Sequence, residues 1–205
     1  MSEYVTAMGI DIALTETGWT LFRIDIEATE KNPVIIDFGV IKSPSDSIRL
    51  KNGLERLEAI YDRGATWYWE VYTLIEKSNV SVIAVETPFG SQTAAGSMAI
   101  GLIYGLLINL KMLLPFLEVR LVHPKDVKKL VAESNPFKDK AVNTISKTLV
   151  RHWVANVHRN EIGLDESEHV YDAAGAFWVY WKNVKATLRY QKNKQGKSEI
   201  SKEFE

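Results

Sequence analysis

Three acidic residues lie within or at the end of apolar stretches, where a charged side chain is unusual. Asp11 lies in residues 8–13, Glu86 ends residues 82–86, and Asp172 lies in residues 171–177. An ionised carboxylate in apolar surroundings is costly unless it is paired or bound to a cation. Because the three are far apart in sequence, we expect the fold to bring them to one shared site. A divalent metal is the simplest common partner, and oxygen ligands suit magnesium or manganese.

Each carboxylate also has a purely structural alternative. Asp11 could form a turn at a strand end, Glu86 could hydrogen-bond locally, and Asp172 could pair with a nearby lysine. Ionisable residues are rarely buried without partners, so the shared metal site is the hypothesis that accounts for all three.

Composition limits the class of protein. The chain has 205 residues, of which 46% are hydrophobic and 25% charged, as in a soluble globular protein with a full core. It has no cysteine, which excludes disulfides and thiolate-bound zinc or iron–sulfur clusters. No signal peptide is visible at the N-terminus. Asn109 and Lys111 interrupt the longest apolar stretch, residues 98–117, so we expect a buried helix and no membrane span. We therefore predict a cytoplasmic protein.

The net charge of −1 argues against nucleic-acid binding, but the charges are unevenly distributed. Acidic residues gather around residues 25–30, 55–62 and 161–168. A local basic face matters more for phosphate binding than the total charge does. Lysines on solvated helix faces are the alternative explanation. The basic residues of the C-terminal half form two groups: Lys125, Lys128, Lys129, Lys138, Lys140, Lys147 and Arg151, and then Lys182, Lys185, Arg189, Lys192, Lys194 and Lys197.

The order of predicted elements indicates an α/β fold. We expect strands at residues 5–11, 17–26, 34–41, 80–86 and 117–122, and helices at 48–77, 92–114, 124–133, 138–153 and 166–189. The first three strands have short links, which is typical of an antiparallel meander, and helices precede each later strand. The sequence thus predicts a mixed five-stranded sheet, with the meander followed by parallel strands and helices on both faces. We expect residues 1–190 to form one domain and residues 191–205 a polar, disordered tail.

The predicted topology places the acidic residues together. Asp11 would lie on the first strand and Glu86 at the C-terminal end of the fourth, at the edge where open α/β sheets bind ligands. Asp172 would lie early on the last helix, which can pack across that edge. His169 is three residues earlier and therefore shares a helical face with Asp172.

The motifs and their order resemble those of RuvC-type Holliday junction resolvases, which belong to the ribonuclease H-like superfamily. The resemblance covers about residues 6–182. Ile12-Ala13 replaces the Pro-Gly that the family usually has after its first Asp, and the tail beyond Lys182 has no counterpart. The matching segments are Gly9-Ile10-Asp11 with Thr17-Gly18-Trp19, Val85-Glu86-Thr87-Pro88-Phe89, the small-residue helix with Ala94, Ala95, Gly101 and Gly105, His123-Pro124-Lys125-Asp126-Val127-Lys128, Lys138-Asp139-Lys140, and His169-Val170-Tyr171-Asp172-Ala173-Ala174.

The resemblance implies a nuclease site made of Asp11, Glu86, His169 and Asp172. We expect these residues to hold two Mg²⁺ ions, for which Mn²⁺ would substitute, in the arrangement suited to in-line phosphodiester cleavage. The resemblance implies that Asp11 bridges both ions. His169 could be a metal ligand, position water or carry a proton, or it could be a surface histidine, with Glu168 supplying the carboxylate instead.

The resemblance also implies contacts with branched DNA. We predict backbone contacts from Lys125, Lys128, Lys129, Lys138 and Lys140. Phe89 could stack on an unpaired base at the junction centre or could be a core residue.

The face with Gly101 and Gly105 permits close helix approach, either within the monomer or at a dimer seam. A four-way junction has two-fold symmetry, which suits a homodimer with two active sites.

The leading hypothesis is a metal-dependent endonuclease that resolves four-way junctions by paired nicks, leaving 5′-phosphate and 3′-hydroxyl ends. One alternative is a nuclease of the same fold that cuts flaps or replication intermediates. Another is a catalytically silent relative that binds nucleic acid, against which the intact carboxylates argue.

Overall fold

A computed structural model describes residues 4–28, 31–43, 53–87, 94–134, 145–158, 161 and 167–202. The described residues form one sheet in the order β3-β2-β1-β4-β5. β1 to β3 are antiparallel neighbours, whereas β4 pairs in parallel with β1 and with β5. The predicted meander and parallel strands are therefore confirmed. The strands are β1 (Tyr4–Asp11), β2 (Glu16–Asp25), β3 (Val34–Lys42), β4 (Val80–Glu86) and β5 (Glu118–Val122).

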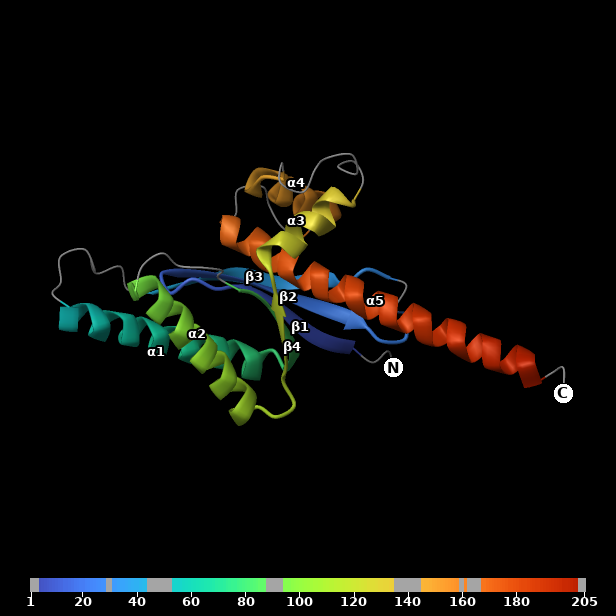
Figure 1. Cartoon of the computed structure of the whole chain (residues 1–205), viewed down its shortest axis with the longest axis horizontal. Coiled ribbons are helices and arrows are strands. Elements are labelled where there is room, and N and C mark those ends of the chain that lie inside the picture. The colour runs from blue at the N-terminus through green and yellow to red at the C-terminus, as the bar shows by residue number, and fades with distance from the viewer. Residues whose placement is uncertain are drawn as a thin grey trace.

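Helices cover both faces of the sheet, as predicted (Figure 1). The first two helices lie on one face, and the last three lie on the other. The first helix connects β3 to β4, and the second connects β4 to its parallel neighbour β5. The helices are α1 (Gly53–Lys77), α2 (Ala94–Leu113), α3 (Pro124–Ala132), α4 (Lys147–Val157) and α5 (Glu168–Lys202).

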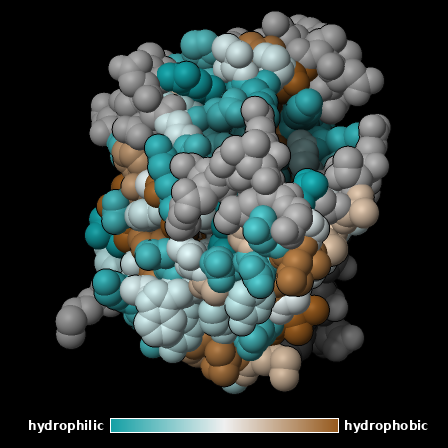
Figure 2. Space-filling model, turned by 90° about the vertical axis from the view of Figure 1, so that its left-hand side faces the viewer, coloured by the Kyte–Doolittle hydropathy of each residue, from teal (hydrophilic) through white to brown (hydrophobic). Residues whose placement is uncertain are grey.

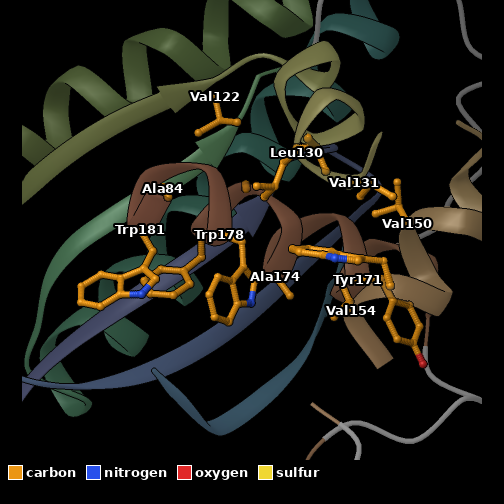
Figure 3. Close-up of a cluster of buried hydrophobic side chains, with 14 of the residues drawn as sticks. Ala84, Val122, Leu130, Val131, Val150, Val154, Tyr171, Ala174, Trp178 and Trp181 are labelled. Carbon is orange, nitrogen blue, oxygen red and sulfur yellow. The ribbon is translucent and has the colours of Figure 1, made fainter. Parts of the chain in front are cut away.

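The alternation of side chains along the strands divides the core into two clusters. Ala7 faces the cluster under α3, α4 and α5, whereas Met8 faces the cluster under α1 and α2. Aromatic rings fill the α5 side, where Phe22 of β2 stacks on Phe177 with ring centroids 3.7 Å apart. Figure 3 shows Trp178 and Trp181 of α5 within the same cluster. These contacts fix α5 against the sheet.

Two glycines allow α5 to lie directly on the strands. A Cβ atom at Gly9 would be 2.1 Å from the Ala173 carbonyl oxygen, and one at Gly18 would be 2.1 Å from the His169 carbonyl oxygen. Both obstacles are backbone atoms, which cannot move without shifting the whole helix. Thr20 also donates a hydrogen bond of 3.2 Å from its hydroxyl to the Val170 carbonyl. Close seating places the first turns of α5 over the end of β1.

The prediction of a buried helix over residues 98–117 is wrong for one side of α2. Ile103, Leu107 and Leu110 are buried, but Ile108 and Met112 are 62% and 74% exposed. The window Gly96–Leu113 has the length and hydropathy of a membrane span, yet only 17% of it is buried. The apolar residues surround the helix, whereas the body of the protein contacts it on one side. Burial on the other side would require a partner.

α5 is longer than the sequence predicts. The sequence predicts that it ends near residue 189, but the helix continues to Lys202. Residues 203–205 of the predicted tail lie outside the described residues. The added segment contains no proline, and its glutamine and lysine residues are good helix formers. The helix therefore runs well past the edge of the sheet (Figure 1).

Candidate active site

Strand pairing places the first two predicted site residues side by side. Asp11 ends β1 and Glu86 ends β4, and they are register partners in the parallel ladder. Partners on neighbouring strands lie about 5 Å apart at the backbone. Asp172 arrives from the second turn of α5, which the glycine contacts hold across β1. The fold therefore brings the three predicted carboxylates to one edge of the sheet.

His169 also joins this site. Its Nδ1 lies 2.7 Å from Oδ2 of Asp11, so the imidazole and the carboxylate are hydrogen-bonded. The neighbouring Glu168 turns to a different partner, because its Oε1 lies 3.4 Å from the Lys147 ammonium. Both candidates for the fourth position thus lie near the site, and His169 is the one that contacts a carboxylate of the site directly.

Lys147 is a site residue that the sequence analysis missed. Its Nζ lies 3.1 Å from Oδ2 of Asp172 and also pairs with Glu168. The sequence predicts one helix over residues 138–153, whereas α4 begins at Lys147. Residues 138–144 lie outside the described residues. Ser146 explains this start, because its hydroxyl accepts a hydrogen bond of 3.3 Å from the Leu149 N–H as an N-cap. In the sequence, Ser146 followed by Lys147 was therefore the signal for the start of α4 and for a lysine at its first position.

The other end of α4 is fixed by a buried histidine. His158 accepts a hydrogen bond of 2.8 Å from the Trp178 indole at Nε2, and its Nδ1 lies 2.5 Å from Glu161. The indole N–H can only donate, so Nε2 carries no proton and the neutral ring donates from Nδ1 to the carboxylate. Burial also lowers the pKa of His158. This contact ties α4 to α5 and so holds Lys147 beside Asp172.

The carboxylates of the site repel one another. Burial raises the pKa of Glu86 to about 8, and the charges of Asp172 and Asp11 add to the increase. Burial also raises the pKa of Asp11 and of Asp172, and for Asp172 the Asp11 charge adds further. Lys147 and Lys128 act in the opposite direction on Glu86. Each raised pKa reports an environment that would favour an additional positive charge.

The donor set fits a hard divalent cation. Carboxylate oxygens are preferred ligands of magnesium and manganese. As the side chains lie, no three His, Asp or Glu residues in the described part of the chain are grouped closely enough to hold an ion. Asp172 is turned to Lys147 and Asp11 to His169, so a protein cation and an imidazole are their present partners. Binding of a metal would require these carboxylates to exchange partners.

Comparison with known proteins assigns the family. A family profile described as "Crossover junction endodeoxyribonuclease RuvC" matches residues 7–162. The chain belongs to the RuvC family. The predicted family is thus confirmed, and the chain is a junction-resolving nuclease. RuvC-family nucleases in general depend on divalent metal. None of the curated proteins compared with the chain matches it.

Solved structures of junction resolvases share the fold. Thermus thermophilus RuvC is 16% identical with a TM-score of 0.61, covering 89% of this chain and 98% of that one. T. thermophilus RuvC in complex with a Holliday junction substrate is 17% identical with a TM-score of 0.59, covering 84% and 90%. The yeast mitochondrial Holliday junction resolvase Ydc2 is 17% identical with a TM-score of 0.58, covering 91% and 81%. At these identities the likeness shows the ribonuclease H-like fold alone.

The predicted DNA-contact lysines of α3 lie in different surroundings. Lys128 lies close enough to the RuvC-family site for its charge to lower the pKa of Glu86. Lys129 instead lines a groove with Glu133 and Lys182, and its charge lowers the pKa of Glu133. Lys125 is exposed, and its N–H donates to Nδ1 of the helix-capping His123 at 3.0 Å. Phe89, Lys138 and Lys140 lie outside the described residues.

Figure 2 looks onto the left-hand end of Figure 1, where α5 begins. Hydrophilic side chains gather in the upper part of this view, and hydrophobic side chains lie mainly along its left, right and lower margins. The upper part carries α3 and α4, and the lower part carries α1 and α2. A polar surface above the sheet edge is the surface that a nucleic-acid backbone would need.

Proposed function

We propose that this RuvC-family nuclease resolves four-way DNA junctions by paired nicks that leave 5′-phosphate and 3′-hydroxyl ends. The observation that carries the proposal is the convergence of Asp11, Glu86 and Asp172 from β1, β4 and α5. The pKa of each of these three carboxyl groups is raised, mainly by burial, so keeping them together is costly unless they bind a cation. A metal-dependent nuclease needs such a site. A junction-bound T. thermophilus RuvC among the structures of this fold supports the choice of substrate.

We propose that Asp11, Glu86, Asp172 and His169 hold two Mg²⁺ ions, with Mn²⁺ as a substitute. When bound, the ions would activate water and stabilise charge on the leaving oxygen. His169 holds one oxygen of Asp11 by its hydrogen bond and so limits how that carboxylate can rotate. Lys147 neutralises Asp172, and its side chain is 58% exposed, so its ammonium is also accessible to a DNA phosphate.

We propose that the DNA backbone passes over α3 and the start of α4. Among the predicted contacts in the described residues, Lys128 is the one whose charge lowers the pKa of Glu86, and Lys125 is exposed on the first turn of α3. Lys129, Lys138 and Lys140 stay predictions, as does stacking of Phe89 on an unpaired base. A cytoplasmic location also stays a prediction, and DNA as substrate is consistent with it.

The outer face of α2 supports a homodimer. Met98, Gly101, Gly105, Ile108 and Met112 follow the spacing of one helical face and are exposed. In the described part of the chain, nothing lies within 4 Å of a Cβ atom built at Gly101 or Gly105. The glycines therefore do not serve the monomer core, and they would let a second copy of the helix approach closely. A two-fold dimer would bury this stripe and present two sites to a two-fold junction.

The dimer can be broken by charge on this stripe. We expect Ile108→Glu with Met112→Glu to give a monomer in light scattering after size exclusion, because two buried carboxylates would oppose association. The monomer should nick one strand without the coordinated second nick. With a junction in a supercoiled plasmid, open circles should therefore accumulate and the yield of linear product should fall. Tyr61→Glu changes a residue of α1 that is 70% exposed and should leave the dimer intact. A double variant that remains dimeric would exclude this face as the seam.

The function itself is tested by cleavage of a synthetic four-way junction beside linear duplex and flap substrates, with magnesium or with EDTA. We expect magnesium-dependent nicks on the junction, with linear duplex left intact. Equal or faster cutting of the flap would favour the nuclease that acts on other branched DNA. Tight junction binding with no cleavage of any substrate would favour the catalytically silent relative.

A further inference from the structure

The C-terminal part of α5 is strongly basic, whereas the rest of the chain has a net negative charge. We call residues 182–202 the basic extension. Of the 25 basic and 26 acidic residues in the chain, seven basic and one acidic residue lie in the extension, leaving 18 basic and 25 acidic residues elsewhere. The extension thus has a net charge of +6 and the remainder −7. The basic residues of the extension are Lys182, Lys185, Arg189, Lys192, Lys194, Lys197 and Lys202.

The start of the extension is fastened to the body of the protein. The preceding turn is buried through Phe177 and Trp181. Lys182 forms an ion pair with Glu133, and Lys185 donates to Oδ1 of Asn32 at 3.1 Å while its ammonium lies 5.5 Å from the Trp181 ring centre. The first two lysines are therefore engaged within the protein. The helix continues past them, beyond the edge of the sheet (Figure 1).

The composition of residues 189–202, the outer part of the basic extension, indicates the chemistry of its partner. Residues 189–202 contain only two large apolar residues, Tyr190 and Ile200, so the segment offers little apolar surface to a protein groove. Its five basic residues against one acidic residue suit a polyanion with regularly spaced charge. Because the remainder of the chain is net negative, the extension would also steer DNA toward the protein.

We propose that the basic extension binds the phosphate backbone of one duplex arm of the junction, at a distance from the cut. This inference rests on the proposed function, which supplies the branched DNA. At about 1.5 Å per residue, Lys197 lies roughly 38 Å along α5 from Asp172. An arm running alongside the helix covers that distance in about eleven base pairs. The contact therefore requires an arm of at least this length.

The test compares two sets of substitutions on two junctions. K192Q/K194Q/K197Q removes three charges, and K192R/K194R/K197R keeps them at the same positions. Junctions with arms of about 20 and about 7 base pairs lie on either side of the required length. Fluorescence anisotropy in calcium, repeated over a range of salt concentrations, gives the affinity and its salt dependence.

On long arms we expect the glutamine variant to bind at least about tenfold more weakly at low salt than the arginine variant, because three phosphate contacts are lost. The slope of log affinity against log salt should become less negative by about 2 to 3. On short arms the two variants should bind equally and cleave equally in magnesium.

Equal binding of the two variants to long arms would overturn the inference, as would the same loss on both arm lengths. Circular dichroism shows whether the glutamine variant keeps its helix content, and its cleavage of the short-arm junction shows that the rest of the protein is intact. Failure of the proposed function gives a different result, because the wild type would then cleave neither junction in magnesium.

Discussion

Asp11→Asn should abolish junction cleavage while leaving junction binding nearly intact. The carboxylate of Asp11 lies at the point where β1, β4 and α5 meet, and asparagine keeps its shape but not its charge. Loss of a charge that holds catalytic metal should cost about 3 kcal/mol or more of transition-state stabilisation, a fall in rate of at least about 100-fold. Single-turnover cleavage in magnesium measures the rate, and anisotropy in calcium measures the affinity.

The matched control for this substitution is Asp62→Asn, which makes the same chemical change on the exposed side of α1. It should leave both cleavage and binding at the wild-type level. Parallel loss of cleavage and binding in Asp11→Asn would give Asp11 a structural role at the strand end. Cleavage at the wild-type rate would show that the reaction does not need this carboxylate.

The sequence alone could place the carboxylates because strand patterning is a local signal. Apolar runs located β1 and β4, and parallel pairing of two such strands necessarily puts Asp11 and Glu86 at one edge. The three-residue spacing from His169 to Asp172 likewise fixed a shared helical face. These patterns depend on residues close in sequence, and the structure confirms the arrangement of the sheet that they predict.

The features that the sequence could not supply depend on contacts between distant elements. Gly9 and Gly18 were recognised as parts of motifs, but their physical role appears only where α5 lies against their backbone. The start of α4 was placed too early, because Asn135-Pro136 is a strong break whereas the Ser146 cap is a short signal. Lys147 was consequently left out of the site. Residues 98–117 were predicted to form a buried helix because apolar composition alone does not show which face of a helix the rest of the protein covers.

Without metal, the wild-type protein should lose stability as the pH rises from about 5 to 8. Burial and the nearby aspartates raise the pKa of Glu86 to about 8, above the ordinary 4.5. Between these values the folded state binds the proton more tightly than the unfolded state does. Stability from this group is therefore complete below about pH 4.5 and is lost progressively as the pH approaches 8.

Glu86→Gln should remove this loss, because a neutral amide occupies the same space at every pH. In EDTA at pH 8 its melting temperature should exceed that of the wild type by several degrees, since about 1 kcal/mol corresponds to roughly 2–4 °C in a chain of this size. The raised pKa values of Asp11 and Asp172 give slopes of the same sign, and the lowered pKa of His158 gives the opposite sign. The difference between wild type and variant therefore isolates Glu86.

The measurement is a set of thermal melts in EDTA from pH 5 to 9, with Glu58→Gln on the exposed side of α1 as the matched control. The control should follow the wild-type curve at each pH. Magnesium added at pH 8 should raise the melting temperature of the wild type more than that of Glu86→Gln. The reason is that the ion would bind more tightly to a folded protein with the Glu86 carboxylate than to one with the neutral amide, and tighter binding gives greater stabilisation. If Glu86→Gln instead melts below the wild type at pH 8 in EDTA, the Glu86 carboxylate is stabilising without metal. The repulsion inferred among the three carboxylates would then be absent.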